Sequence, residues 1–402
     1  MPASKTAKAA SALACGEDWE NVLDDLLAQL DSKQLKQCDL AVLFASSSFA
    51  PAYPQILARL RAATDAGVLI GCSGQGVIGG EQEIEGRPAM ALLALALPGT
   101  NLNFAHFTQS QLETHSTGED WLKLTGVSQD QANSWLLFAD PFSADAEGFL
   151  NRFSTAYPHT PLVGGLASAD PQTHKTYLFL NDDVYEEGMI GLALSGSCAV
   201  RTIVSQGCMP IGQTWAITSV NGNAIETIAQ RPALEVLLET LQALPSDIQE
   251  RARRNLLVGF AMDEYKDDFG RGDFLIRNLF GMDRESGSIV VGALPHIGQT
   301  LQFQIRDPQA ADEDLRELLG KAVREMTGER VLGAVLCSCN GRGVGLFGAP
   351  HHDAEAISEL LGPLPLAGFF CNGEIGPVAG RNFLHGFTAS MAVIVAGADD
   401  HA

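Results

Sequence analysis

The most restrictive feature of this chain is an order of elements that recurs along it. An apolar strand, a short amphipathic helix, a second strand that reaches glycine and a further apolar strand follow one another in three copies, which start at Leu40, Trp135 and Leu332. A fixed order at a long period indicates duplication of one folding unit. A fourth, damaged copy without its helix is expected over Leu256–Pro295. The sequence therefore predicts an α/β protein with mixed sheets, in which duplicated strand-helix-strand-strand units form two similar domains.

The expected division of the chain follows from the position of one helix. Residues 232–244 read PALEVLLETLQAL, a helical pattern with proline in its first turn. We expect a flexible segment over residues 1–19, a first domain over 20–230, a second domain over 231–397 and a tail over 398–402.

The stretch GCSGQGVIGG, residues 71–80, raises the question of whether its glycines cradle a phosphate or shape a turn. Residues 368–375, GFFCNGEI, repeat its spacing of glycine, four residues, glycine, one residue and isoleucine. Recurrence with the folding unit favours a backbone role. Strand ends brought together would also place backbone amides and small side chains such as Cys72 and Ser73 around one cavity. No Gly-x4-Gly-Lys-Ser/Thr motif is present in the sequence.

Charge and composition exclude several functions. The formal net charge of −22 repels nucleic acid and anionic membrane surfaces, and 46% hydrophobic residues with 41 glycines are typical of a globular protein with many tight turns. We expect a cytoplasmic protein, because the sequence has no long uncharged apolar run and no signal-peptide pattern at its start. Its eight cysteines are expected to be reduced.

Several motifs together give the chain a family resemblance. They are GCSGQGVI, VGGLAS with Asp170, QGCMPIG, VNGNAIETI, RPALEVL, FLIRNLFGMD, FQIRD, CNGRG, GFFCNGEIGPV and NFLHGFTA, in that order. In this the chain resembles the FIST (F-box and intracellular signal transduction) proteins, from about Leu40 to Gly397. The resemblance implies a FIST N-terminal-like domain over 20–230, a FIST C-terminal-like domain over 231–397, and sensing of small molecules such as amino acids for a signalling output protein.

Charged residues at strand ends are the best candidates for a binding site. Asn340 and Arg342 follow a buried strand, and the guanidinium of Arg342 suits a carboxylate or phosphate. Glu374 lies at the matching turn of the last copy, where it could accept a ligand ammonium or the guanidinium of Arg342. A structural ion pair is the alternative for each. Arg277 and Asn278 are consecutive in a predicted strand, so at most one of them faces a pocket.

Thiols permit two further interpretations. Cys72, Cys339 and Cys371 come at strand ends, where a nucleophile would be presented, but free cysteines are commonly buried apolar residues. Cys337 and Cys339 with His351 and His352 lack the spacing of common zinc sites, so no metal is predicted.

The resulting prediction is a sensory protein that binds a small polar metabolite in a pocket where the equivalent turns converge. The alternatives are a cysteine-dependent enzyme and a protein-interaction scaffold. No cofactor, nucleic acid or membrane is expected as a partner. The predicted ligand-binding residues are Arg342, Asn340, Glu374, Cys72, Ser73, Cys339, Arg277 and Asn278.

Overall fold

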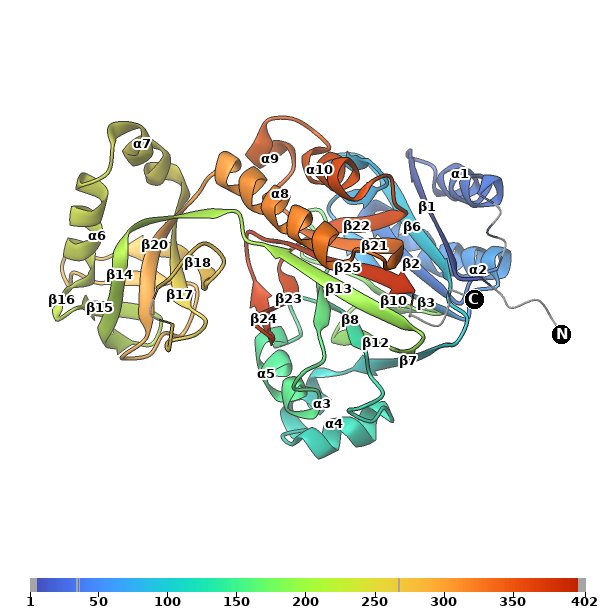
Figure 1. Ribbon diagram of the computed structural model, residues 1–402, viewed down its shortest axis with the longest axis horizontal. Coiled ribbons are helices and arrows are strands. Elements are labelled where there is room, and N and C mark those ends of the chain that lie inside the picture. The colour runs from blue at the N-terminus through green and yellow to red at the C-terminus, as the bar shows by residue number, and fades with distance from the viewer. Residues whose placement is uncertain (1–5, 34, 36, 267, 397–402) are drawn as a thin grey trace. The chain divides into compact units, whose positions relative to one another are not determined.

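The computed structural model describes residues 6–33, 35, 37–266 and 268–396 (Figure 1). The chain divides into two compact units. Unit 1 comprises the described residues up to Val204, Arg316–Leu384, and the described residues from Thr388 on; unit 2 comprises Ser205–Leu315 and His385–Phe387. The predicted tail, 398–402, lies outside the described residues, and the division near residue 230 remains a prediction about family domains.

Three modules with one common order of elements account for unit 1; a few residues of the third module, Ser205, residues 308–315 and His385, are assigned to unit 2. Module 1 contains β1 (Lys8–Cys15), α1 (Trp19–Ser32), β2 (Leu40–Ser46), a 3-10 helix η1 (Ser47–Ala52), α2 (Tyr53–Thr64), β3 (Val68–Gly74), β4 (Val77–Gly79), β5 (Gln82–Ile84) and β6 (Ala89–Ala96). Module 2 contains β7 (Thr100–Phe107), α3 (Gln109–Thr114), α4 (Gly118–Thr125), β8 (Ser134–Ala139), α5 (Ala146–Ala156), β9 (Leu162–Leu166), β10 (Leu178–Leu180), β11 (Asp183–Tyr185) and β12 (Met189–Gly196). Module 3 contains β13 (Cys198–Ser205), α8 (Pro308–Glu325), β21 (Arg330–Cys339), α9 (Val344–Phe347), α10 (His352–Leu361), β22 (Leu366–Cys371), β23 (Glu374–Val378), β24 (Arg381–His385) and β25 (Ala389–Ala396).

Strand pairing within the modules is the same three times. In module 1, β2 pairs in parallel with β3 and antiparallel with β6. β8 does the same with β9 and β12, and β21 with β22 and β25. A helix connects the two parallel strands in each module, as a crossover between parallel neighbours requires. The predicted α/β class with mixed sheets and duplicated units is thereby confirmed.

The modules complete one another's sheets. The three sheets of unit 1 run β1-β6-β2-β3-β10-β11, β7-β12-β8-β9-β23-β24 and β13-β25-β21-β22-β4-β5. The last two strands of each sheet come from a different module than the other four. Module 2 supplies β10 and β11 to the first sheet, module 3 supplies β23 and β24 to the second, and module 1 supplies β4 and β5 to the third. The exchange is cyclic, and an isolated module would leave one strand edge unpaired.

Glycines permit the close approach of the parallel strands. In all three modules a glycine lies beside a leucine of the neighbouring strand: Gly71 beside Leu43, Gly164 beside Leu137 and Gly368 beside Leu336. A Cβ atom built on these glycines would lie 1.8, 1.8 and 2.2 Å from the oxygen of the neighbouring leucine. The recurring glycine is therefore a steric requirement of strand packing, which answers the question raised by residues 71–80.

Apolar side chains pack on both faces of the first sheet. α1 and α2 cover one face of the first sheet, through a cluster that includes Leu26, Leu57 and Leu43 (Figure 1). The opposite face contributes to a core shared by all three modules, in which Phe44, Leu136 and Val335 are buried. Apolar residues on both faces explain why these strands read as continuous hydrophobic runs in the sequence.

Unit 2 has a different architecture. It contains β14 (Cys208–Asn221), β15 (Ala224–Ile228), β16 (Arg231–Pro232), α6 (Ala233–Gln242), α7 (Ser246–Asn255), β17 (Leu256–Ala261), β18 (Phe274–Met282), β19 (Ile289–Val291) and β20 (Thr300–Arg306). These strands form a sheet of order β14-β20-β17-β18-β19-β15-β16. The expected fourth copy over Leu256–Pro295 is wrong: β17 and β18 are antiparallel neighbours without a crossover helix, so a hairpin replaces the duplicated unit.

The N-terminal prediction also needs correction. The sequence predicts a flexible segment over residues 1–19, but Lys8–Cys15 forms β1, which pairs antiparallel with β6 along its whole length. The segment KAASALAC is rich in alanine, which the sequence pattern does not mark as a strand former. Its small side chains are nevertheless buried at Ala10, Ala12 and Ala14 beneath α1. Tertiary packing therefore decides its conformation.

Substitution of a module glycine tests the steric argument. We expect Gly164→Ala to lower the free energy of unfolding by about 3 kcal/mol or more, because the added methyl group meets a backbone oxygen that can move only with β8. Gly345→Ala is the matched control, since nothing lies within 4 Å of a Cβ at that position. Urea denaturation of both variants gives the comparison. Equal stability of the two alanine variants would contradict the argument.

Candidate ligand-binding site

The carboxyl ends of the module strands meet through hydrogen bonds. Ser73 at the end of β3 donates its hydroxyl to the Ser168 carbonyl oxygen at 2.8 Å, and the Ser168 amide donates to the Ser73 carbonyl oxygen at 3.1 Å. The Ser168 hydroxyl in turn donates to the carbonyl oxygen of Phe370 in β22. The structure thus brings together one strand end from each module, and Ser73, a predicted site residue, is one of the buried links.

The expected hollow at this centre is filled by side chains. The rings of Phe44 and Phe369 stack with centroids 4.7 Å apart, and Phe138 lies 5.4 Å from the first ring and 5.9 Å from the second. All three rings are fully buried. The prediction of a pocket shared by all the equivalent turns is therefore wrong, because inward-facing aromatic residues occupy the space that the strand ends surround.

Arg342 has an intramolecular partner. Its guanidinium donates to both carboxylate oxygens of Asp353, at 2.7 and 2.8 Å, and both side chains are fully buried. The Arg342 side chain also lies over the ring of Phe347, 5.3 Å from its centroid. Arg342 thus forms a structural ion pair, the alternative to ligand binding for this residue, and its acidic partner is Asp353.

Glu374 is buried and hydrogen-bonded to its neighbours. Its carboxylate accepts from the Cys371 thiol at 3.2 Å and from the Thr388 amide at 3.0 Å. The side-chain amide of Asn340 donates to the side-chain oxygen Oδ1 of Asn372 at 2.7 Å, and Cys339 is partly exposed at the end of β21. These contacts join neighbouring strand ends within module 3.

The remaining predicted residues lie elsewhere. Arg277 and Asn278 belong to β18 in unit 2, where the guanidinium of Arg277 donates to the Ile276 carbonyl oxygen at 3.0 Å and Asn278 is exposed. Cys72 is fully buried in β3. Arg277 and Asn278 therefore belong to a different compact unit from the other six predicted residues.

The buried thiols are poorly suited to nucleophilic chemistry. Burial raises the pKa of Cys72, Cys337 and Cys371 well above that of an ordinary thiol, and for Cys337 and Cys371 the nearby carboxylate of Glu374 raises it further. A thiol reacts as its thiolate, so a raised pKa lowers the reactive fraction at neutral pH. These side chains act as small apolar residues of the core.

An open pocket lies beside the centre, at the carboxyl ends of β2 and β3. We call it the strand-end pocket. Its volume is about 380 Å³, and it is lined by Ser46, Ser47, Ser48, Gly74, Gln75, Gly86, Arg87, Pro88, Asp170, Pro171 and Thr173. Gly74 and Gln75 belong to the glycine-rich stretch of residues 71–80. Ligands of α/β proteins commonly bind at the carboxyl ends of strands, where loops surround a rigid sheet.

Hydrogen bonds hold the walls of the strand-end pocket. The Ser46 hydroxyl accepts from the Ala89 amide at 3.0 Å, and the Ser47 hydroxyl accepts from the Asp170 amide at 3.3 Å. The Gln75 amide donates to the Ser168 hydroxyl at 2.7 Å. Four loops from two modules are therefore fixed to one another, so the pocket is formed before any ligand arrives.

Two side chains of opposite charge line the strand-end pocket without an intramolecular ion pair. Arg87 precedes β6 and Asp170 follows β9, and both are exposed. In the described part of the chain, neither side chain takes part in a salt bridge. The side chains of Ser48, Gln75 and Thr173 are also exposed at the same pocket. The pocket thus offers one cation, one anion and several neutral hydrogen-bonding groups.

Part of this pocket could have been found from the sequence. The run Ser46–Ser48 directly follows an apolar strand, and Asp170 stands beside the motif VGGLAS, so both are polar groups at strand ends. Arg87 carries no such signal, because it lies in a loop after a short hairpin. Its position depends on strand pairing that no local pattern specifies.

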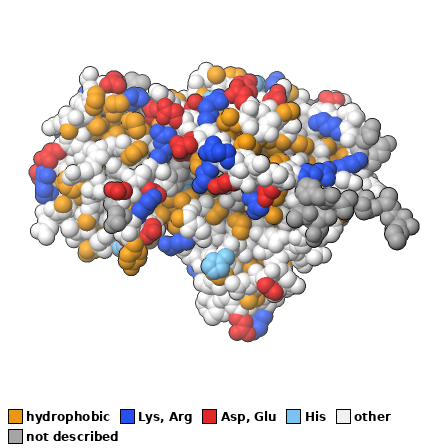
Figure 2. Space-filling view, viewed as in Figure 1, with side chains coloured by type: hydrophobic (Ala, Val, Ile, Leu, Met, Phe, Trp, Pro, Cys, Tyr) orange, Lys and Arg blue, Asp and Glu red, His pale blue; other side chains and the backbone are white. Residues whose placement is uncertain are grey.

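Other site types find little support. Within residues 6–396, apart from the three undescribed positions, no group of three His, Cys, Asp or Glu residues is placed to hold a metal ion. None of the described helices is both long enough and apolar enough to span a membrane. On the face shown in Figure 2, described side chains of both signs are interspersed.

Together the fold and the pocket define an α/β protein of three strand-exchanged modules with a small polar pocket. The chain belongs to the FIST family: the FIST N domain matches residues 39–231 and the FIST C domain matches residues 233–377. FIST domains are in general sensory domains of signal transduction.

Similar proteins extend the comparison. An uncharacterized protein of Mycobacterium tuberculosis is 41% identical over 358 residues, which cover 89% of this chain and 91% of that protein. An uncharacterized protein of Mycobacterium bovis is 39% identical over 359 residues, covering 89% and 90%. A solved cyanuric acid hydrolase covers 98% of this chain and 100% of its own with a TM-score of 0.37 and 8% identity. A likeness at that level carries no information about activity.

A buried carboxyl group next to the Arg342–Asp353 pair makes stability depend on pH. Glu83 of β5 accepts at one oxygen from the amides of Asp353 and Ala354, at 3.0 and 3.1 Å. Burial, followed by the charge of Asp353, raises the pKa of Glu83 to about 7. Since the folded pKa exceeds the unfolded value, the contribution of this group to stability is present at low pH and is lost as pH rises through 7.

Glu83→Gln tests this linkage. A glutamine keeps the accepting oxygen but cannot ionise, so we expect the free energy of unfolding of the variant relative to wild type to rise by about 2 kcal/mol between pH 5 and pH 8. Glu119→Gln, at an exposed position of α4, is the control and should show no such trend. The measurement is urea denaturation at several pH values. A difference between wild type and Glu83→Gln that stays constant with pH would refute the linkage.

Proposed function

We propose that this protein is a sensory protein that binds a small polar metabolite, of the amino-acid class, in the strand-end pocket. The observation that carries the proposal is the pair of unbridged charges, Arg87 and Asp170, in one preformed polar pocket. A guanidinium binds a carboxylate through parallel hydrogen bonds, and a carboxylate binds an ammonium group. A molecule with both groups matches both side chains.

The surrounding groups suit a polar ligand. Ser48, Gln75 and Thr173 offer donors and acceptors at the mouth of the pocket, whereas apolar side chains are limited to two prolines. The pocket volume of about 380 Å³ lies near the lower end of the range for small-ligand sites. A compact polar zwitterion therefore fits better than a large apolar molecule.

A sensory role also requires a way to transmit binding. The loops of the pocket belong to modules 1 and 2, whose sheets exchange strands, so a ligand that fixes these loops also stabilises the junction of the two modules. We propose that a signalling output protein recognises this ligand-bound state.

A ligand screen with pocket variants tests the proposal. Thermal unfolding in the presence of each proteinogenic amino acid should show stabilisation by a subset with polar side chains, with about 2.7 kcal/mol expected at a concentration one hundred times Kd. Arg87→Gln and Asp170→Asn should each weaken binding by about tenfold or more, because each removes a charge-assisted contact.

The control uses an exposed ion pair of the same unit. Arg59→Gln and Asp24→Asn remove the same two charge types from α2 and α1 and should leave binding unchanged. Stabilisation that survives in both pocket variants would place the ligand elsewhere. Absence of any shift across the panel, or release of a chemically altered product, would overturn the sensory assignment.

A further inference from the structure

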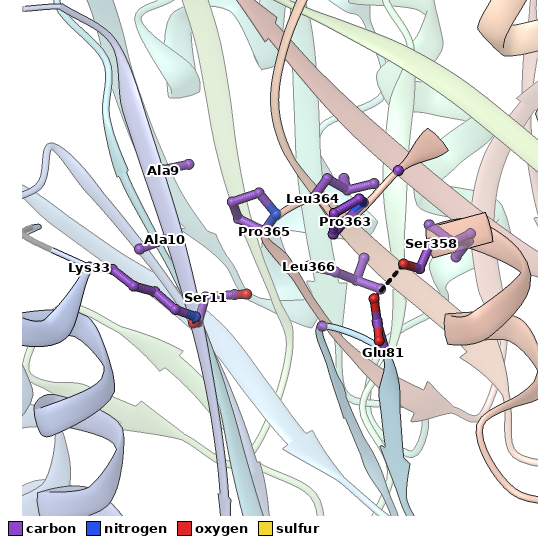
Figure 3. Close-up of a pocket in the computed structure, with 13 residues that line it drawn as sticks. Ala9, Ala10, Ser11, Lys33, Glu81, Ser358, Pro363, Leu364, Pro365 and Leu366 are labelled. Carbon is purple, nitrogen blue, oxygen red and sulfur yellow. Dashed lines mark hydrogen bonds between the residues drawn. The ribbon is translucent and has the colours of Figure 1, made fainter. Parts of the chain in front are cut away.

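A groove with polar and apolar walls lies along the open edge of β1, and it shares no lining residue with the strand-end pocket. Two hollows of about 360 and 350 Å³ share Ser11, Lys33, Gly80 and Glu81. The first extends along the segment that connects α10 with β22, and the second extends toward Leu13. Figure 3 shows the first hollow, with β1 on one side and the connecting segment on the other. The shared residues make the two hollows one continuous groove.

The groove runs along the backbone of an edge strand. β1 is the outermost strand of its sheet, and its backbone groups at Ser11 and Leu13 bond to side chains of α1 and the residue after it. The Gln29 side-chain amide donates to the Leu13 carbonyl oxygen at 2.8 Å and accepts from the Leu13 amide at 3.2 Å. The Lys33 ammonium group donates to the Ser11 carbonyl oxygen. By the alternation of a strand, Ala9 presents its backbone groups to the same edge.

Such an edge is suited to an extended chain. Peptide ligands commonly add to an open strand edge, where main-chain hydrogen bonds provide affinity and side-chain pockets provide selectivity. Gln29 and Lys33 have long, flexible side chains, which hydrogen-bond to the backbone of β1 at Leu13 and at Ser11. The backbone of an incoming peptide offers the same donors and acceptors in a regular array.

The groove has a cationic side chain, Lys33, on one wall and an anionic side chain, Glu81, on the other. Lys33 lies beside β1, and Glu81, in the turn between β4 and β5, accepts from the Ser358 hydroxyl at 2.7 Å (Figure 3). Among the described residues, Lys33 and Glu81 form no ion pair with each other or with another side chain. A ligand with a free carboxylate and a free ammonium group would pair with both. The two termini of a short peptide are such groups.

The wall opposite β1 is apolar. It is formed by Ile357, Pro363, Leu364, Pro365 and Leu366, with two prolines that have no amide hydrogen to donate. This wall therefore contributes contacts through packing rather than hydrogen bonds. It suits an aliphatic side chain of an extended peptide, which stands out from the plane in which the peptide backbone pairs with β1.

We propose that the groove binds a short apolar peptide with free ends, two or three residues long. The peptide lies in extended form along Ala9–Leu13, its carboxylate pairs with Lys33, its ammonium group pairs with Glu81, and an aliphatic side chain packs on Leu364 and Pro365. Its ligand class and position are distinct from those of the strand-end pocket. The proposal therefore adds a peptide site to the polar-metabolite site proposed above.

Calorimetric titration with the dipeptide L-leucyl-L-leucine tests the site. We expect saturable binding at millimolar or lower concentration, weakened about tenfold or more by N-acetylation or by C-terminal amidation of the probe. Lys33→Gln should weaken binding of the free peptide but should not change binding of the amidated peptide. Glu81→Gln should likewise weaken binding of the free peptide and should not change binding of the acetylated peptide. These two results together would show that the peptide carboxylate binds Lys33 and the peptide ammonium group binds Glu81.

Matched controls separate the groove from other effects. Lys123→Gln and Glu119→Gln remove an exposed pair on α4 and should bind the dipeptide as wild type does. Arg87→Gln should also retain dipeptide binding, which makes a failure of this proposal distinguishable from a failure of the strand-end pocket. Urea denaturation verifies that each variant folds.

Three results would overturn the proposal. They are absence of binding at millimolar dipeptide, equal binding of free and blocked dipeptides, and unchanged binding by both Lys33→Gln and Glu81→Gln. Equal affinity for free L-leucine would also overturn it, because a single amino acid cannot extend along the edge strand and use both walls as a peptide does.

Discussion

Strand exchange among the three modules is the constraint on which the structure of unit 1 depends. Each parallel strand pair receives its next neighbour from another module, in a cycle that closes after three steps. A module taken alone would expose an unpaired edge and its part of the shared apolar core. Within each module, glycine at the equivalent position permits the close approach of the two parallel strands. The repeated unit therefore carries the glycine that its own strand pair needs and an edge that another module completes.

This arrangement also explains where binding groups can lie. The centre, where the strand ends meet, is occupied by three aromatic rings and a chain of serine hydrogen bonds, so it contributes stability and leaves no room for a ligand. An open space lies at the side of module 1, where loops from two modules form the strand-end pocket. Differences in sequence between the three modules therefore bear on ligand binding where they lie in the loops. Similarities between the modules reflect the packing of their strands.

Burial and partners divide the charged residues into two groups. Arg342 and Asp353 are buried and bridge each other through two hydrogen bonds, and Glu83 caps the start of the same helix, α10. Removing one member would leave a buried charge without its partner, so these residues serve the fold. Arg87 with Asp170, and Lys33 with Glu81, are pairs of opposite charge that share a pocket without an ion pair between them. Such separated charges are available to a ligand.

The sequence alone determined the duplicated order of strands and helices, the glycine spacing, the family and the acidic, globular character of the chain. These are local or periodic properties, which each segment carries wherever it lies. Only the tertiary structure decided that Arg342 pairs with Asp353, that the expected central hollow is filled, that Lys8–Cys15 forms an edge strand, and that Arg87 reaches the pocket containing Gln75. Each of these depends on contacts between segments distant in the chain, and the cyclic exchange of strands that creates them leaves no pattern within any single segment.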